Sequence, residues 1–332
     1  MYEPGVRVLI TGATGKIGNA VAHRLAERGD HVIALVRDPV RARGLLPASV
    51  EMAPGDVTDP ESLRLAAAGA EAAVNCMGIF EQWTPDPDIF NRVNAAGARA
   101  VVEAARDAGA GRFVHTSTFD VFHAPRGGTV TEDVVADYEK STPYERSKQL
   151  AERLVIQEAA EGEGLELVIV NPAGIIGPGP WAEGGFDPTL RDLLRGRLPV
   201  VPPGGMSLTY VDDAADAHVA ALDRGLAGER YIVAGGYATI REICASAVSE
   251  AGRGRIPRAL PEKLARRVAN AGETVANLIN RPPLLPAGQL DFLLWEARAD
   301  ATKVRAQLGI EPRPPEEAVR QTVRWMIEEG LA

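Results

Sequence analysis

Cysteine is nearly absent from this sequence. Its 332 residues include two cysteines, Cys76 and Cys244, which stand far apart and in apolar surroundings. A framework of several disulfides, on which many small extracellular domains depend, cannot be built from one pair. We therefore predict two buried free thiols and a reducing, cytoplasmic location.

Long apolar runs and an excess of basic residues are also missing. No stretch reaches the roughly 18 uninterrupted apolar residues of a membrane span. The formal net charge of −9 disfavours nucleic acid as a partner, because such binding needs a basic surface. The five histidines form no closely spaced pair of ligands, so we predict no metal site. We expect a globular protein that acts on a small-molecule substrate, with neither a membrane nor a nucleic acid as partner.

A glycine-rich segment separates an apolar run from a helical pattern near the N-terminus. Residues 6–10 are mostly aliphatic, which is typical of a strand buried on both faces of a parallel sheet. Gly12, Gly15 and Gly18 follow where this strand turns into a helix over residues 16–28, and their missing Cβ atoms let backbone amides approach a pyrophosphate. Tight turns also use glycine without any ligand, so the segment alone leaves both interpretations open.

The second predicted strand, residues 31–36, ends at a basic residue. In dinucleotide-binding folds this position contacts the adenosine ribose, and an acidic side chain there would accept from its 2′-hydroxyl. Arg37 can instead pair with a 2′-phosphate, which favours NADP over NAD. Arg41 and Arg43 are either further phosphate-binding cations or a solvated helix face.

Strand and helix signals alternate with short connections through about the first 170 residues, which predicts a doubly wound parallel sheet. Asp56 and Val57 follow the third predicted strand, residues 50–53, where they would contact the adenine. A plain loop aspartate is the alternative for Asp56. Cys76 and Gly78 follow the fourth strand, at the edge of the sheet where cofactors bind.

Residues 79–90 place Phe80, Trp83 and Phe90 among prolines. Such a segment is either the wall of a substrate pocket, which we favour, or ordinary loop packing. An alanine-rich helix is expected from about 89 to 108.

Tyr144 and Lys148 stand four residues apart in a predicted helix and therefore share one of its faces. An ammonium group near a phenol favours the phenolate, so Tyr144 could exchange a proton near neutral pH. Lys148 could at the same time bind the ribose of a nicotinamide. A pair at this spacing also arises by chance in many helices.

These segments together resemble the extended short-chain dehydrogenase/reductase superfamily, which includes the NAD-dependent epimerases and dehydratases, over essentially the whole chain. Residues around Arg37, Trp83 and 299–309 most resemble its dihydroflavonol-4-reductase-like branch. The matching motifs are Thr11-Gly12-Ala13-Thr14-Gly15-Lys16-Ile17-Gly18, Asp56-Val57, Val93-Asn94 with Gly97, Thr118-Phe119-Asp120-Val121, Tyr144 to Lys148, Asn171-Pro172 with Gly177-Pro178, and Tyr210-Val211-Asp212-Asp213.

The resemblance implies an α/β Rossmann fold and a role for each matched position. Thr118 would bind the substrate carbonyl, with Ser117 as the alternative, while Tyr144 supplies a proton and Lys148 binds the ribose. Asn94 would lie beside the nicotinamide or hold the neighbouring helix. The implied cofactor-binding residues are Gly12, Thr14, Gly15, Lys16, Ile17, Gly18, Arg37, Asp56, Val57, Cys76, Gly78, Asn94, Tyr144, Lys148, Pro172, Gly174 and Ile175.

One acidic position of the superfamily is matched only in part. Sugar dehydratases use two acids at the positions of Phe119 and Asp120, and the first is missing here. We therefore interpret Asp120 as a loop residue.

The resemblance also implies a division of the chain. Residues 1–173 would bind the dinucleotide, and residues 174–332 would form most of a smaller, interleaved substrate lobe, with a strand and helix from about 207 to 235 returning to the first part. Nucleotide-sugar enzymes of the superfamily place an arginine where this chain has Met206, and a second within the stretch matching residues 289–295, which has none. A sugar diphosphate needs those cations, so a fairly apolar substrate fits better. Arg191, Arg195 and Arg197 are interpreted as a solvated helix face.

We expect an NADP-dependent oxidoreductase that interconverts a ketone and a secondary alcohol. An epimerase or dehydratase that uses the cofactor transiently, with NAD as an alternative to NADP, is the second candidate. A regulator that binds the cofactor without catalysis is the third. The resemblance leaves the oligomeric state open: helices near 89–108 and 142–161 pair in homodimers of the family, whereas the reductase branch includes monomers.

Overall fold

The computed structural model describes residues 5–80, 83–161, 164–180, 185–279, 281–283 and 285–332. They contain a parallel sheet of seven strands, in the order β11-β7-β5-β4-β1-β2-β3. The direction of strand order reverses between β1 and β4, which is where doubly wound sheets bind dinucleotides. The strands are β1 (Arg7–Thr11), β2 (His31–Val36), β3 (Glu51–Pro54), β4 (Ala72–Asn75), β5 (Arg112–Thr116), β7 (Glu166–Pro172) and β11 (Arg230–Val233).

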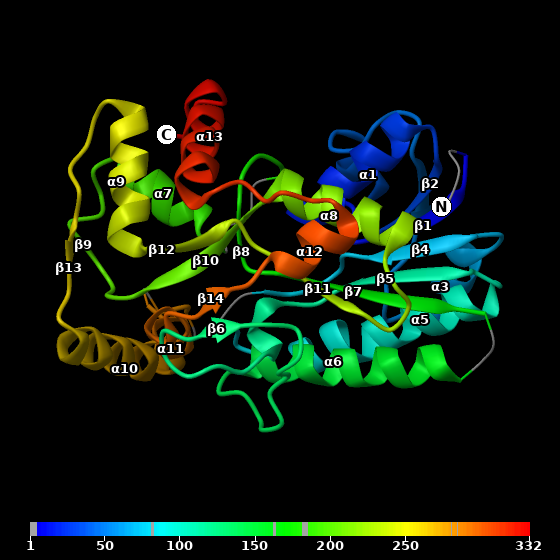
Figure 1. Cartoon of the computed structure of the whole chain (residues 1–332), viewed down its shortest axis with the longest axis horizontal. Helices are drawn as coiled ribbons and strands as arrows, with labels where there is room; N and C mark the ends of the chain where they lie inside the picture. Colours follow the sequence, from blue (N-terminus) through cyan, green and yellow to red (C-terminus); the bar gives the residue numbers. More distant parts are fainter. Residues whose placement is uncertain (1–4, 81–82, 162–163, 181–184, 280, 284) are drawn as a thin grey trace.

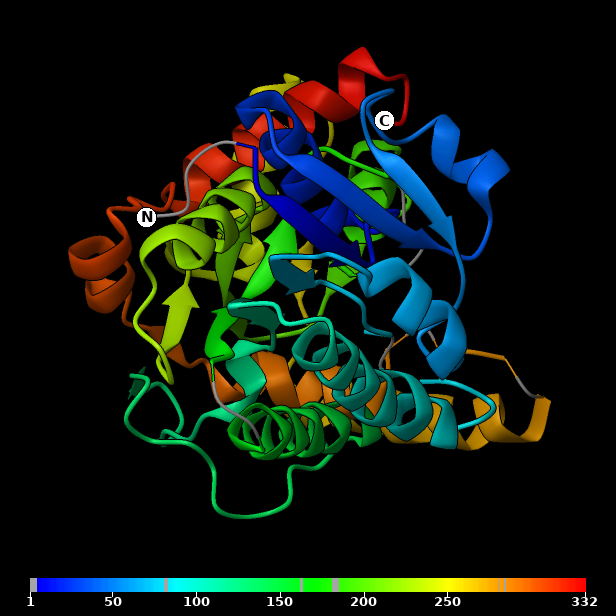
Figure 2. The same ribbon diagram turned by 90° about the vertical axis from the view of Figure 1, so that its right-hand side faces the viewer.

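Helices cover both faces of this sheet, as expected for strands that are apolar on both sides (Figures 1 and 2). One core lies under α1 (Lys16–Arg28), α8 (Val211–Arg224) and α12 (Thr302–Leu308). The other lies under α3 (Pro60–Ala67), α5 (Ala98–Asp107) and α6 (Pro143–Ala160). The predicted α/β Rossmann architecture is confirmed.

A smaller lobe is built on a three-stranded sheet in the order β12-β10-β8, beside the large sheet in Figure 1. Its core lies between α7 (Asp187–Leu194), α9 (Ile240–Ala251) and α13 (Pro315–Glu328). The strands are β8 (Gly174–Ile176), β10 (Gly205–Tyr210) and β12 (Gly236–Thr239). A helical pair, α10 (Glu262–Ile279) and α11 (Ala287–Trp295), lies at the outer end of the lobe. The remaining short elements are α2 (Pro39–Arg43), α4 (Asp88–Phe90), η2 (Phe119–Val121), β6 (Thr129–Val130), β9 (Val200–Val201), β13 (Arg258–Ala259) and β14 (Arg298–Ala299).

Two features differ from the sequence-based expectation. Residues 207–235 were expected to return to the first part of the chain. Within them, β11 pairs with the large sheet and α8 packs against it, but β10 pairs with β8 and β12. The helix expected over 89–108 contains a π-helical stretch, η1 (Asn91–Gly97), between α4 and α5. Such wide turns are rare and often occur at functional sites.

Candidate functional site

The glycines that follow β1 are required by close backbone contacts. Gly12 has a φ of 74°, and a Cβ there would lie 2.6 Å from the carbonyl of Cys76 at the end of β4. A Cβ on Gly18 would collide with the carbonyl of Gly12. Only glycine therefore lets β1, α1 and the end of β4 meet this closely.

The N-terminus of α1 is left open toward an anion. Gly15 occupies the N-cap position, where it contributes no side-chain hydrogen bond, and the first turn contains no acidic residue. Among the described residues no side chain caps these amides, so they and the positive end of the helix dipole could bind a phosphate. Thr14, Lys16 and Ile17 border this end, so these residues fit a dinucleotide pyrophosphate.

Lys16 differs from the other residues of this segment because its side chain contacts the lobe. Its ammonium group forms an ion pair with the buried Asp187 at the start of α7 and donates to the carbonyl of Gly177. It also lies 5.3 Å from the ring centre of Trp325 on α13. Any cofactor contact of Lys16 in this arrangement would come from its backbone.

The end of β2 is followed by the exposed Arg37 and by Asp38, whose carboxylate caps the next helix. Asp38 caps α2 by accepting from the backbone amides of Val40, at 3.0 Å, and Arg41, at 3.1 Å. Arg37, immediately before it, is exposed. The acidic side chain nearest the expected ribose is thus committed to a helix cap.

Asp56 is also held by local hydrogen bonds. One of its oxygens accepts from the amide and the hydroxyl of Thr58. Although burial acts in the opposite direction, these bonds and the charge of Arg37 lower the pKa of Asp56. Val57 is buried in the core and contacts the position where Gly97 would carry a Cβ. Both residues lie at the end of β3, on the side of the sheet expected for the adenine.

Lys148 is buried beneath the end of β5. Its Nζ donates to the carbonyl of Thr116 at 2.7 Å, which ties α6 to the strand that leads to Thr118. Burial lowers the pKa of Lys148 to about 8, against the raising effect of Glu152 and Asp120. The amine is therefore mostly protonated at neutral pH.

Tyr144 lies in the first turn of α6, whose start is fixed by a capping box. The hydroxyl of Thr142 accepts from the amide of Glu145, and the carboxylate of Glu145 accepts from the amide of Thr142. The buried Phe90 ring packs against Tyr144 in a T-shaped arrangement, with ring centres 6.4 Å apart and an angle of 70° between the rings. Phe90 thus supports the phenol, one turn before Lys148.

Thr118 caps the short helix η2 and is positioned through its backbone. Its hydroxyl accepts from the amide of Asp120 at 3.3 Å. Its carbonyl accepts at 3.0 Å from the side chain of Asn171, which also donates to Glu152. Ser117, the alternative residue, is buried, and its hydroxyl has no hydrogen-bond partner among the described residues.

Asn171 was not predicted as a positioning residue. Its place before Pro172 matched a motif, but a contact to a carbonyl 53 residues earlier leaves no local signal in the sequence. Arg230 pairs with the second oxygen of Glu152 and extends the same network to β11.

Asn94 joins two parts of the site. Its side chain accepts from the amide of Ile79 at 2.7 Å, donates to the carbonyl of Ile79 at 2.8 Å, and donates to Ser147 on α6 at 3.0 Å. Asn94 lies in the π-helical stretch η1. It therefore holds α6 against the backbone that follows β4, which is the structural one of its two expected roles.

Asp120 lies beside Thr118 in a poorly solvated position. Burial, together with the negative charge of Glu145, raises the pKa of Asp120 to about 7. A carboxyl group that titrates near neutral pH next to the candidate catalytic threonine was not expected from a loop residue.

The remaining residues expected to contact the cofactor follow or lie on strands. Gly78 and Cys76 follow β4, Pro172 ends β7, and Gly174 and Ile175 lie on β8. Cys244 is buried as expected, but Cys76 is only partly so, which corrects that prediction; both thiols are free. Burial raises the pKa of each to about 12, so neither is a reactive thiolate.

The aromatic segment is only partly covered by the structure, because residues 81 and 82 lie outside the described residues. Phe80 is partly exposed near Gly185, whereas Phe90 is buried against Tyr144. Whether this segment lines a substrate pocket stays a prediction.

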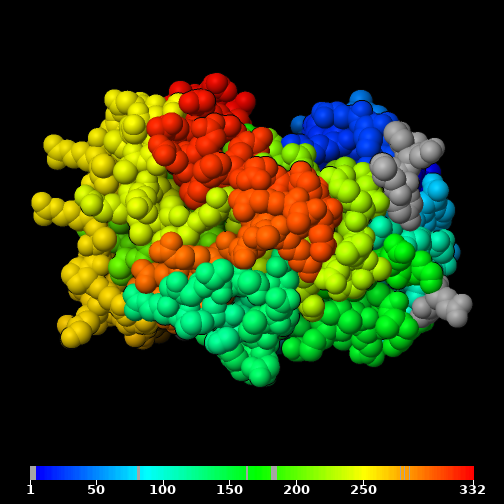
Figure 3. All heavy atoms as spheres, in the orientation of Figure 1, coloured from blue at the N-terminus to red at the C-terminus, as the bar shows by residue number. Residues whose placement is uncertain are grey.

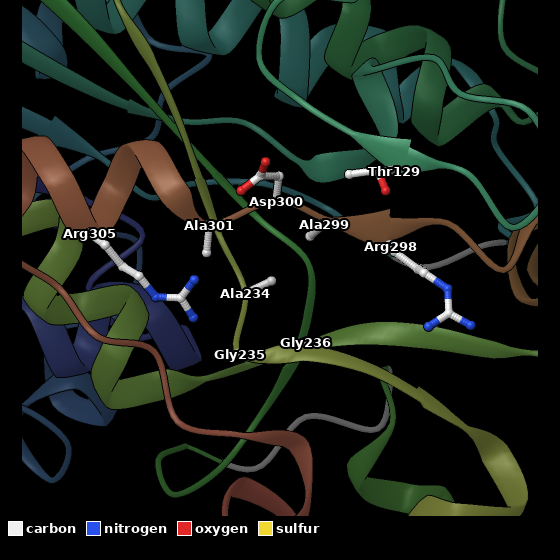
Figure 4. A pocket seen from close by; sticks show the side chains of 9 residues that line it. All are labelled: Thr129, Ala234, Gly235, Gly236, Arg298, Ala299, Asp300, Ala301 and Arg305. Atoms are coloured by element: carbon white, nitrogen blue, oxygen red, sulfur yellow. The ribbon is translucent and has the colours of Figure 1, made fainter.

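A small hollow of about 210 Å³ lies where the chain passes from β11 to β12 (Figure 4). Its basic residues, Arg298 and Arg305, stand on opposite sides of it; the first stacks on Tyr237 and the second pairs with Glu311. β11 is the edge strand, four positions from β1 in the sheet, so this hollow is separate from the expected cofactor site.

The described residues include no cluster of metal ligands. His218 is a buried histidine that bonds to Thr116 and to the carbonyl of Ala214, and burial lowers its pKa to about 4. In the same part of the chain, no helix is long and apolar enough to cross a membrane.

Comparisons with known proteins agree with this geometry. Residues 8–234 match the family model described as the NAD dependent epimerase/dehydratase family. Over 326 residues the chain is 32% identical to sterol demethylase protein B of Methylococcus capsulatus, covering 97% of this chain and 99% of that protein. Over 294 residues it is 30% identical to 2-alkyl-3-oxoalkanoate reductase of Stenotrophomonas maltophilia, covering 84% and 87%. The crystal structure of gox2253 superimposes with a TM-score of 0.78 at 27% identity, covering 99% of both chains.

Proposed function

Because the chain belongs to the NAD dependent epimerase/dehydratase family, we propose that it reduces the ketone of an apolar substrate with NADPH. It is an NAD(P)-dependent oxidoreductase of the extended short-chain dehydrogenase/reductase type. The finer points, which are the cofactor, the direction and the substrate class, rest on the residues of the site.

The observation that carries the proposal is the buried contact between Lys148 and the carbonyl of Thr116, one helical turn after Tyr144. This contact supports a positive charge one helical turn from the phenol, at the end of the strand that leads to Thr118. Bound at the end of α1, the dinucleotide would supply the hydride. Tyr144 would give its proton to the substrate oxygen, Thr118 would donate a hydrogen bond to that oxygen, and Lys148 would stabilise the phenolate left behind.

The lobe supports an apolar substrate over a sugar diphosphate. Met206, at the place of a phosphate-binding arginine in nucleotide-sugar enzymes, is buried and contacts Gly174 on β8. Its neighbours Ser207 and Leu208 are buried and uncharged. The names of two relatives refer to a sterol and to an alkyl-substituted oxoalkanoate, both largely apolar.

The test measures net oxidation of NADPH with apolar ketones of increasing size and with UDP-glucose. Tyr144→Phe should lower turnover of the best ketone by about 1,000-fold, because the proton donor is lost, while NADPH affinity stays within about threefold. Tyr138→Phe, the same change at an exposed tyrosine, is the control. Interconversion of UDP-glucose without net oxidation would contradict the proposal and favour an epimerase. A biological role that survives Tyr144→Phe but not loss of cofactor binding would favour a regulator.

The preference for NADP rests on Arg37 and on the engagement of Asp38 by the cap of α2. Arg37→Ser should weaken NADPH binding by roughly 10- to 100-fold, as expected for the loss of a charge-assisted contact, and leave NADH binding unchanged. Arg153→Ser, the same change at an exposed arginine of α6, is the control. Equal losses for both cofactors, measured by fluorescence titration, would show that Arg37 does not bind a 2′-phosphate.

A further inference from the structure

The helix α10 exposes an apolar stripe. Leu264, Val268, Val275 and Leu278 are 46%, 46%, 54% and 85% exposed. Their spacing of four, seven and three residues places them on one face of the helix. Its buried face, with Ala265, Ala269 and Ala276, packs toward Leu290 and Leu294 of α11. The stripe therefore adds to the surface of the protein and contributes nothing to its core.

The same region is basic in an acidic protein. Residues 251–283 include seven lysines and arginines but only two glutamates, a local charge of +5 in a chain whose total is −9. Within the described residues, six of the seven have no carboxylate partner; the exception is Arg266. The six are Arg253, Arg255, Arg258, Lys263, Arg267 and Arg281.

The basic residues of α10 lie beside its apolar stripe. Arg267 and Lys263 precede Val268 and Leu264 by one residue, so they flank the stripe on one side, opposite the face that packs on α11. The two glutamates are occupied elsewhere: Glu262 pairs with Arg126 and Arg266, and Glu273 accepts from the amide of Ala287. An apolar stripe bordered by cations is typical of helices that lie in a membrane interface.

Neighbouring elements extend this surface. Arg258 pairs with Val200 in the ladder between β13 and β9, and Val200 and Ile256 are exposed apolar residues. In Figure 1 these strands and α10 lie at the same end of the molecule, and Figure 3 shows long side chains of this segment projecting there. The surface is connected to the candidate site through α11, whose Trp295 ring lies 5.4 Å from Phe119, next to Thr118.

We propose that α10 docks the protein on the surface of an anionic phospholipid bilayer. The apolar stripe would enter the headgroup region, and Lys263, Arg267 and the basic residues around β13 would pair with lipid phosphates. Pairing of this face with the same face of a second copy would oppose like charges, because both glutamates of α10 already have partners. This proposal departs from the sequence-based expectation of no membrane partner, which rested on the absence of a spanning segment.

The docking surface gives an apolar ketone a source, since such a substrate dissolves in the bilayer next to α10. That reading of the substrate rests on the proposed function. The exposed stripe and the local positive charge, on which docking rests, do not involve the catalytic residues.

The experiment is flotation of the full chain with vesicles of phosphatidylcholine alone or with added phosphatidylglycerol. A triple variant, Val268→Asn, Val275→Asn and Leu278→Asn, removes three of the four residues of the stripe and is called the stripe variant. Lys263→Gln with Arg267→Gln removes two charges. Val40→Asn, Leu65→Asn and Leu226→Asn change three exposed apolar residues elsewhere and serve as the matched control.

We expect binding to the vesicles that contain phosphatidylglycerol, a loss of tenfold or more in the stripe variant, and no change in the control. The charge variant should lose about 30-fold on anionic vesicles, in line with roughly 1 kcal/mol for each of the two cations, and its remaining binding should depend less on salt. Absence of vesicle binding, or equal binding to neutral and anionic vesicles, overturns the proposal. Self-association that only the stripe variant abolishes, seen by light scattering without vesicle binding, also overturns it.

NADPH binding and reduction of a water-miscible ketone are measured on the same variants. These activities should be unchanged, because no altered residue belongs to the catalytic or cofactor-binding set. If the unaltered protein reduces the ketone but does not bind the vesicles, docking alone is rejected. If no ketone is reduced while vesicle binding is retained, only the proposed function is rejected.

Discussion

The N-termini of α1 and α6 both face the candidate site, but they are built in opposite ways. At α1 the cap position is Gly15, no side chain caps the helix, and the first turn has no acid. At α6 a reciprocal pair, Thr142 and Glu145, satisfies the end of the helix before Tyr144 and Lys148 emerge from it. The N-terminus of α1 has no side-chain cap, whereas the N-terminus of α6 is capped by residues of its own sequence.

The difference separates binding from positioning. An uncapped helix end keeps amides and a positive dipole for an anionic ligand, at some cost in stability. A capped end fixes the first turn and so the direction of the side chains on it. A change at the end of α1 should therefore lower cofactor affinity and leave the free energy of unfolding unchanged. A change at the end of α6 should lower the free energy of unfolding and leave cofactor affinity unchanged.

The largest effect is expected at α1. Gly15→Asp should weaken NADPH binding by about 100-fold or more, because a carboxylate would occupy the place of the pyrophosphate. Gly15 has ordinary extended backbone angles, so aspartate can cap α1 there, and the free energy of unfolding should not fall. Titration of NADPH fluorescence and urea unfolding measure the two quantities.

Gly15→Ala is the control for the added Cβ, which would lie 3.3 Å from the carbonyl of Gly12. We expect it to weaken binding far less than aspartate does. Equal losses for alanine and aspartate would show that space, and not charge, is what Gly15 provides.

A smaller effect is expected where the capped end of α6 faces Asp120. Burial and Glu145 raise the pKa of Asp120 to about 7, above its unfolded value of about 3.9, so the folded protein binds more protons between these values. The contribution of Asp120 to the free energy of unfolding should therefore be present in full below pH 4 and be lost as the pH rises through 7. Between pH 5 and 7.5 we expect a loss of about 2 kcal/mol that Asp120→Asn removes.

Urea unfolding of both proteins at the two pH values measures this difference. Asp133→Asn, on a more exposed acid of the following loop, is the control. A wild type and an Asp120→Asn variant with the same pH dependence would show that Asp120 ionises normally.

The smallest effect is expected from the cap of α6. Thr142→Ala should lower the free energy of unfolding by about 1 kcal/mol, while NADPH affinity stays within about twofold. Thr142→Ser keeps the hydroxyl and should lose little. A large loss of cofactor affinity in Thr142→Ala with unchanged stability would contradict the separation between the two helix ends.

The parts of the fold that sequence could predict are those fixed by short-range geometry. Gly12 and Gly18 are required by backbone contacts that a strand, turn and helix always make, and Tyr144 and Lys148 share a helix face by their spacing. The strands of the large sheet are apolar runs that alternate with helical segments, which predicts a doubly wound parallel sheet.

The parts that could not be predicted depend on distant partners. Asp187, which binds Lys16, lies 171 residues later in the chain, and nothing in the N-terminal motif indicates it. The π-helical stretch around Asn94 has the composition of an ordinary helix. For α10, periodicity predicts an apolar face, but only the packing of α11 shows that the apolar stripe is left uncovered.

Through Lys16, the expected dinucleotide-binding loop contacts the helices α7 and α13 of the smaller lobe. A hinge motion between the two parts would have to leave the buried Asp187 without its counter-ion, which costs about 3–5 kcal/mol in comparable buried pairs. The loop and the helices α7 and α13 should therefore move together as one rigid body, and any opening of the site has to occur between other elements.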